Sequence, residues 1–177
     1  MRLLLVRHCQ STGGSPESAL TDSGHAAAAV LADRLIPFGP DAVYASPYAR
    51  AVSTVSPLAT RLKTEIKVDD RLRERVRSSE EIEDVDGYLH RSFIDEDYRA
   101  VGGESLRQAA DRGLAALADI RRACHRCAVV ATHRTLISSI LRSINPEFGF
   151  AEWREMVTPD VFSLRFEGLR PIAFERL

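Results

Sequence analysis

Short apolar runs that alternate with amphipathic segments restrict this chain to the α/β class. The runs at residues 3–6, 42–45 and 127–131 are apolar almost throughout, as expected of strands that helices cover on both faces. The segments between and after them repeat apolar residues at helical spacing. Strands alternating with helices in this way favour a mostly parallel sheet.

Residue types that cap helices open the amphipathic segments. They are Thr21, Ser46 followed by Pro47, Ser105 and Thr132. Gln108 follows Ser105 at the spacing of a capping box. Near the end, residues 161–166 and 172–174 flank Gly168 and predict an edge hairpin. We therefore predict a three-layer α/β/α architecture around a mostly parallel central sheet.

Residues 77–101 interrupt the alternation. This segment is polar, mixed in charge, and carries the aromatic residues Tyr88, Phe93 and Tyr98, so we predict an insertion that forms a small cap. A chain of 177 residues with 45% hydrophobic content lies within the range of one folded unit. We therefore expect residues 1–177 to form a single domain.

The balance of acidic and basic residues indicates which classes of partner the chain is expected to bind. With 24 Lys and Arg against 25 Asp and Glu, the chain has no broad basic surface, and we expect neither nucleic acid nor membrane as a partner. The first apolar run is shorter than the roughly 7–15 residues of a signal-peptide core. Together with three cysteines, which cannot all pair within one chain, this predicts a cytoplasmic location. Nothing in the sequence indicates an oligomeric state.

Cationic and imidazole side chains follow three of the predicted strands. Arg7 and His8 end the first, Arg50 follows the second, and His133 follows the last buried run. Because ligands bind beyond the carboxyl ends of parallel strands, we expect these groups to converge at one edge. Guanidinium groups and a helix N-terminus suit phosphate. His8, with an ordinary pKa of about 6.5, can act as a nucleophile without a metal ion or cofactor.

Six segments resemble motifs of the histidine phosphatase superfamily, the phosphoglycerate mutase-like group. They are residues 5–8 (LVRH), 20–24 (LTDSG), 44–51 (YASPYARA), 72–74 (LRE), 102–105 (GGES) and 131–133 (ATH). The resemblance implies a phosphoglycerate mutase-like fold in which His8 becomes phosphorylated while Arg7, Arg50 and His133 hold the phosphate. It also implies that Glu74 protonates the leaving oxygen and later deprotonates water. His8, Glu74 and His133 are thus the expected catalytic residues.

Departures from the family pattern fall next to these residues. Cys9 replaces the glycine that usually follows the nucleophile, and Gly14 replaces an asparagine that contacts phosphate. Arg134 replaces the glycine that usually follows the second histidine. Its side chain either adds a phosphate donor or points to solvent, and we expect the solvent-facing orientation. Glu104 and Ser105 either contact the site or only begin a helix.

Two cysteine patterns suggest other chemistry and are incomplete. His8 and Cys9 resemble the start of the loop of cysteine-dependent phosphatases, but Ser15 stands where that loop needs arginine. Cys124 and Cys127 form a C-x-x-C pair with no second ligand pair nearby in sequence, whereas a structural zinc site normally needs four ligands. We predict no metal site.

The predicted reaction is hydrolysis of a phosphomonoester, with a small phosphorylated metabolite or a phosphoprotein as substrate. Two alternatives stay open: a phosphoglycerate mutase-type isomerase, and a non-catalytic module that senses phosphate. Mutases of this family tend to carry longer segments that exclude water, so the short stretch at 77–101 favours a phosphatase.

Overall fold

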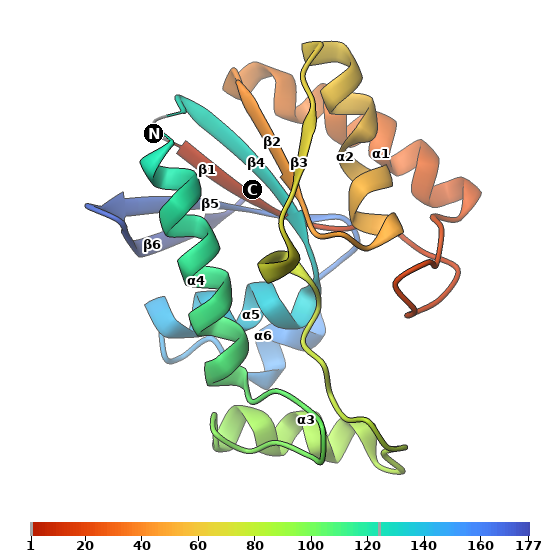
Figure 1. The fold of residues 1–177 in the computed structure, drawn as a ribbon, viewed down its shortest axis with the longest axis vertical. Helices are drawn as coiled ribbons and strands as arrows, with labels where there is room; N and C mark the ends of the chain where they lie inside the picture. Colours follow the sequence, from red (N-terminus) through yellow and green to blue (C-terminus); the bar gives the residue numbers. More distant parts are fainter. Residues whose placement is uncertain (1, 124) are drawn as a thin grey trace.

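One mixed sheet organises the chain (Figure 1). The computed structural model describes residues 2–123 and 125–177, and in it six strands take the order β3-β2-β4-β1-β5-β6. They are β1 (Arg2–Arg7), β2 (Ala42–Ala45), β3 (Ile66–Val68), β4 (Cys127–Thr132), β5 (Asp160–Glu167) and β6 (Arg170–Arg176). The first four pair in parallel, while β5 and β6 are antiparallel. The predicted mostly parallel sheet is confirmed.

Helices cover both faces of this sheet. They are α1 (Asp22–Leu35), α2 (Ala49–Leu62), α3 (Val85–Ile94), α4 (Leu106–Arg122), α5 (Arg134–Ile144) and α6 (Phe150–Glu155), with short 3-10 helices at Ile36–Phe38 and Asp70–Leu72. Because side chains alternate along a strand, Leu4 and Val6 pack against α1 and α2, whereas Leu3 and Leu5 pack against α4 and α5. Figure 1 shows the resulting three layers.

The helix starts agree with the sequence at two positions and differ at two. Thr132 was expected to begin a helix, but it ends β4, and its hydroxyl donates to the carbonyl of Leu72. Thr21 accepts a hydrogen bond from the amide of Gly24, and Ser105 forms a complete capping box with Gln108. Ser46 was expected to cap the second helix, but α2 begins only at Ala49 without a side-chain cap. The Ser46 hydroxyl instead bonds a histidine of the site described below.

The segment 77–101 carries α3, and Figure 1 shows this helix apart from the sheet, beyond the ends of α4 and α6. Tyr88, Leu89 and Phe93 of α3 pack with Trp153 of α6 in a separate apolar cluster. The prediction of a cap is therefore confirmed. The helix α6 was not predicted, because six residues carry too little periodicity to show one.

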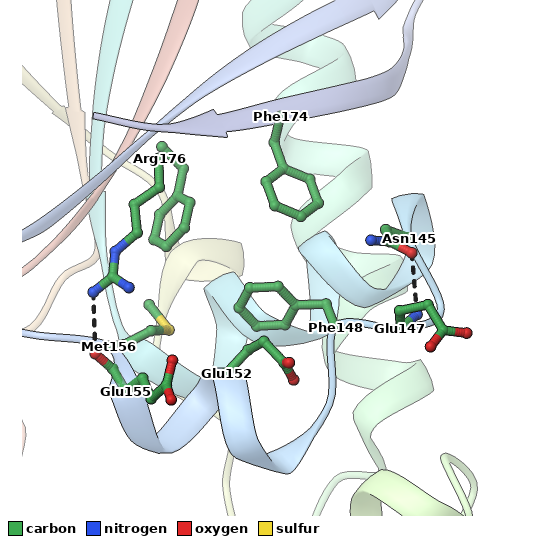
Figure 2. A pocket seen from close by; sticks show the side chains of 9 residues that line it. Asn145, Glu147, Phe148, Glu152, Glu155, Met156, Phe174 and Arg176 are labelled. Carbon is green, nitrogen blue, oxygen red and sulfur yellow. Dashed lines mark hydrogen bonds between the residues drawn. The ribbon is translucent and has the colours of Figure 1, made fainter.

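The C-terminal hairpin was predicted around Gly168, which has a left-handed φ of 56°. Beneath it a hollow opens between β6 and α6 (Figure 2), lined by Phe148, Met156 and Phe174 among others. At its edge Arg176 bonds the carbonyl of Glu155 at 3.0 Å and the carboxylate of Asp160 at 2.8 Å. These two contacts of Arg176 hold the loop between α6 and β5 in place. No helix in the described ranges is long and apolar enough to cross a membrane.

A substitution at Gly24 tests how closely α1 approaches the loop after β1. A methyl group on Gly24 would lie 2.2 Å from the backbone oxygen of Gln10. We expect Gly24→Ala to lower the free energy of unfolding by roughly 1–3 kcal/mol, although alanine favours a helix by about 1 kcal/mol. Urea denaturation measures the change.

The matched control is Gly14→Ala, because the methyl group that it adds meets no atom of the described residues within 4 Å, apart from position 14 and its two chain neighbours. It should change the free energy of unfolding by no more than about 0.5 kcal/mol. Equal stability of the two variants would show that α1 tolerates the methyl group.

Candidate active site

The candidate site lies where β1, β2 and β4 end. Arg7 pairs with Thr132 across the parallel strands, and the amide of His8 donates to the Thr132 carbonyl at 3.0 Å. The amide of Ser46, just after β2, donates to the Ala131 carbonyl at 2.9 Å. The three strand ends therefore meet at one edge of the sheet, as the sequence predicted.

Hydrogen bonds fix the orientation of the His8 ring. Its Nδ1 lies 2.7 Å from the carbonyl oxygen of Cys9, and its Nε2 lies 3.2 Å from Nε of Arg50. Because the carbonyl only accepts and the guanidinium only donates, the proton sits on Nδ1 and Nε2 keeps its lone pair. Burial, aided by the charges of Arg50, Arg7 and Arg134, lowers the pKa of His8 to about 4. The ring is thus neutral at neutral pH.

Arg50 is anchored from the other side. Its Nη1 donates to the carbonyls of Gly14 and Ser15, at 3.2 and 2.7 Å, and its Cζ lies 4.9 Å from the centroid of the Tyr48 ring. The residue is buried, with 4% of its surface exposed. These contacts hold the guanidinium beside His8.

Arg7 is held by the loop between α6 and β5. Its Nη1 donates to the carbonyls of Met156 and Val157. Burial, more than the charge of Arg134, lowers the pKa of Arg7 to about 10, so the group stays protonated at neutral pH. Its Nε is buried and has no hydrogen-bond partner within the described ranges.

His133 is fully buried at the start of α5. Its Nε2 lies 2.7 Å from Oγ of Ser46, and its ring centroid lies 5.2 Å from that of His8. Burial holds the pKa of His133 well below its ordinary value. Among the described residues Nδ1 of His133 finds no partner. Buried polar atoms rarely stay unpaired, and the oxygens of a bound phosphate could pair with both this nitrogen and Nε of Arg7.

The carboxylate of Glu74 faces the N-terminus of α5. It accepts hydrogen bonds from the amides of Thr135 at 3.2 Å, Leu136 at 3.1 Å and Arg75 at 2.8 Å. A helix N-terminus favours negative charge. The structure therefore brings Glu74 to the same helix end that carries His133.

Arg112 of α4 positions Glu74, and the sequence did not predict this role. Its guanidinium donates to the carbonyls of Arg71, Arg73 and Glu74, at 2.7, 2.9 and 3.3 Å. It also pairs with Glu104 at 2.7 Å. Glu104 therefore supports the segment between β3 and α3 through Arg112. Ser105 caps the start of α4. A lone arginine on a helix carries no sequence signal for such a role.

A cavity of about 270 Å³ adjoins these groups. Its lining comprises Gly14, Arg50, Glu74, Arg75, Arg77, Val85, Asp86, Leu89, Arg134, Thr135 and Trp153. The predicted solvent-facing orientation of Arg134 is wrong. Its side chain is half-buried in this wall, with Cζ 3.7 Å from the centroid of the Trp153 ring. The error arises from the unpredicted helix α6, which supplies Trp153.

The amino-acid sequence of this chain also matches a known protein family. The histidine phosphatase superfamily, branch 1, matches residues 3–168 of the chain. The chain belongs to this superfamily.

Among relatives, this histidine phosphatase superfamily member is 39% identical over 80 residues to putative phosphoserine phosphatase 2 of Hydrogenobacter thermophilus, covering 41% of this chain and 39% of that protein. The matched region thus spans well under half of that relative.

Solved structures extend the likeness of the fold. A mycobacterial glucosyl-3-phosphoglycerate phosphatase in complex with inorganic phosphate has a TM-score of 0.81 at 22% identity, covering 99% of this chain and 94% of that one. A mutant phosphoserine phosphatase from Entamoeba histolytica, bound to phosphoserine, has a TM-score of 0.78 at 18% identity, covering 98% and 95%. The phosphoglycerate mutase-like fold is therefore confirmed.

The cysteines of this histidine phosphatase superfamily member contribute no exposed thiolate to the described site. Cys9 is buried, its amide donates to Oγ1 of Thr54 at 2.9 Å, and burial raises the pKa of its thiol to about 11. Of the C-x-x-C pair, Cys124 lies outside the described residues, and Cys127 is buried in β4. In residues 2–123 and 125–177, no group of three His, Cys, Asp or Glu side chains is arranged to hold a metal ion.

The low pKa of His8 predicts how this protein responds to acid. In the unfolded chain His8 takes up a proton near pH 6.5, whereas in the folded protein it does so near pH 4. The unfolded state therefore binds more protons between these values, and the contribution of His8 to stability falls as the pH drops from about 6.5 to 4. Histidine NMR titration should give His8 a pKa near 4.

The His8→Gln variant assigns the resonance and should lose part of the acid-induced fall in stability. A titration of His8 above pH 6 would contradict the neutral, half-buried ring described here.

Proposed function

We propose that this chain hydrolyses a phosphomonoester through a phosphohistidine intermediate on His8. One observation carries the proposal: the unprotonated Nε2 of His8 faces Arg50 in a site where buried nitrogens of Arg7 and His133 lack partners in the described ranges. Phosphoryl transfer depends mainly on positioning and on fixed positive groups around the phosphate oxygens. This arrangement supplies both.

In the first step, Nε2 of His8 attacks phosphorus. The N–P bond forms while the P–O bond to the leaving group breaks, and Glu74 gives its proton to the departing oxygen. Arg7, Arg50 and His133 bind the remaining phosphate oxygens. Glu74 enters this step in its protonated form and leaves it as a carboxylate.

In the second step, water attacks the phosphoryl group. Glu74, left as a carboxylate, takes a proton from this water, the N–P bond breaks, and inorganic phosphate leaves. The amides of Thr135 and Leu136 at the start of α5 hold this carboxylate in place. His8 and Glu74 return to their starting protonation states, so no metal ion or cofactor enters the cycle.

The substrate class follows from the cavity and from the relatives. A cavity of about 270 Å³ suits a small ligand better than a protein segment. The similar proteins are named for phosphoserine and glucosyl-3-phosphoglycerate, both small phosphorylated molecules. We therefore favour a phosphorylated metabolite over a phosphoprotein.

Hydrolysis of p-nitrophenyl phosphate in the presence of a chelator tests the mechanism. We expect turnover by the wild type, none by His8→Ala, and a rate roughly 10² to 10⁴ lower for Glu74→Gln, because that variant loses the positioned acid and base. An acid-labile, alkali-stable phosphoryl adduct on His8 should accumulate in Glu74→Gln.

Cys9→Ser is the matched control and should keep most of the activity, because the buried Cys9 thiol takes no part in the steps above. Equal rates for wild type and His8→Ala would defeat the proposal. Loss of activity in chelator would overturn only its metal-independent part.

A further inference from the structure

We propose that Arg134 is a specificity-determining residue that binds a carboxylate of the substrate. The preferred ligand class is then a phosphomonoester that carries a carboxylate close to its phosphate. The inference rests on the proposed function, since it concerns the same cavity. It begins from the guanidinium of Arg134, which lies in the cavity wall directly after His133.

The guanidinium of Arg134 has unused donors. It forms no hydrogen bond or ion pair with any residue in the described ranges, although it is half-buried in the cavity wall. Two other arginines of this wall differ: Arg50 bonds backbone carbonyls and His8, and Arg75 bonds Tyr88 and the carbonyl of Glu104. Arg77 lines the wall too, but its side chain is exposed, whereas Arg134 is held half-buried against Trp153. The five N–H groups of the Arg134 guanidinium are therefore available to an acceptor beside the site.

Trp153 holds this guanidinium in a fixed orientation. Its ring lies 3.7 Å from Cζ of Arg134, and it stacks on Phe150 with the centroids 5.4 Å apart and the planes 11° apart. The indole nitrogen lies 3.4 Å from Oγ1 of Thr135. Because the ring covers a face of the guanidinium, the N–H groups at its edge are the ones left for a ligand. Paired edge donors match the two oxygens of a planar carboxylate.

Arg134 is close to the reacting groups. It directly follows His133, and it shares the cavity wall with Arg50 and Glu74. Its charge helps to lower the pKa of both His8 and Arg7. One small molecule can therefore present its phosphate to His8 and a second anionic group to Arg134.

The surrounding charges favour a carboxylate over a second phosphate. Glu74 and Asp86 line the same wall, and both interact electrostatically with Arg134. A second phosphate would carry about two negative charges towards these carboxylates, whereas a carboxylate carries one, so the repulsion is smaller.

A matched pair of ligands tests the inference without any reaction. D-3-Phosphoglycerate and sn-glycerol 1-phosphate share the arrangement at C2 and differ only in a carboxylate against a hydroxymethyl group. Calorimetry measures their affinities for the full chain carrying His8→Ala, which leaves the ligands intact. We expect 3-phosphoglycerate to bind roughly 10- to 100-fold more tightly, as for a charge-assisted hydrogen-bonded pair. Adding Arg134→Gln should remove this preference while changing the affinity for glycerol phosphate less than about threefold.

Further variants separate charge from geometry. Arg134→Lys keeps the charge and loses the planar fork, so it should retain only part of the preference. Arg165→Gln, on the exposed side of β5, should retain all of it. Unchanged binding of glycerol phosphate shows that a variant still folds.

Two results would overturn the inference: equal affinity of the two ligands in the His8→Ala background, or an equal loss for both ligands on adding Arg134→Gln. The second result would mean that Arg134 binds the transferred phosphate or only supports the wall. Because binding is measured without turnover, a carboxylate preference would survive a failure of the p-nitrophenyl phosphate assay. That failure would remove the proposed reaction alone.

Discussion

Parallel pairing of β1 and β2 with the central strand β4 is the constraint on which the site depends. The amides of His8 and Ser46 bond carbonyls of β4, so one backbone ladder fixes where both segments leave the sheet. Each element then turns away from the same edge, and the side chains just past the strand ends face one another. A shift of the register by one residue would turn these side chains to the opposite faces.

Positive charge in this molecule is concentrated around the candidate active site. The whole chain is close to neutral, yet Arg7, Arg50 and Arg134 lie near His8 and help to keep its ring unprotonated. The site is thus organised to attract an anion while its central imidazole stays neutral. Glu74 places a carboxylate beside these positive groups, and this carboxylate accepts hydrogen bonds from amides of the helix that begins beside His133.

Features encoded by nearby residues could be predicted from the sequence, and features made by distant contacts could not. The buried strands, the capping box at Ser105 and the convergence of strand ends follow from local patterns and from parallel topology. The start of α2 was predicted too early, because the Ser46 hydroxyl serves His133 instead of a helix end. Arg112 was missed as part of the site, since it acts on a segment that only the tertiary fold brings near. The catalytic roles of the site residues remain predictions.

The loop between α6 and β5 joins the two ends of the chain. Arg7, near the beginning, is held by carbonyls of this loop, and the loop in turn is tied to Arg176 in the last strand. The position of Arg7 therefore depends on the hairpin of β5 and β6, because one of the carbonyls that hold Arg7 belongs to a residue 149 positions further along the chain.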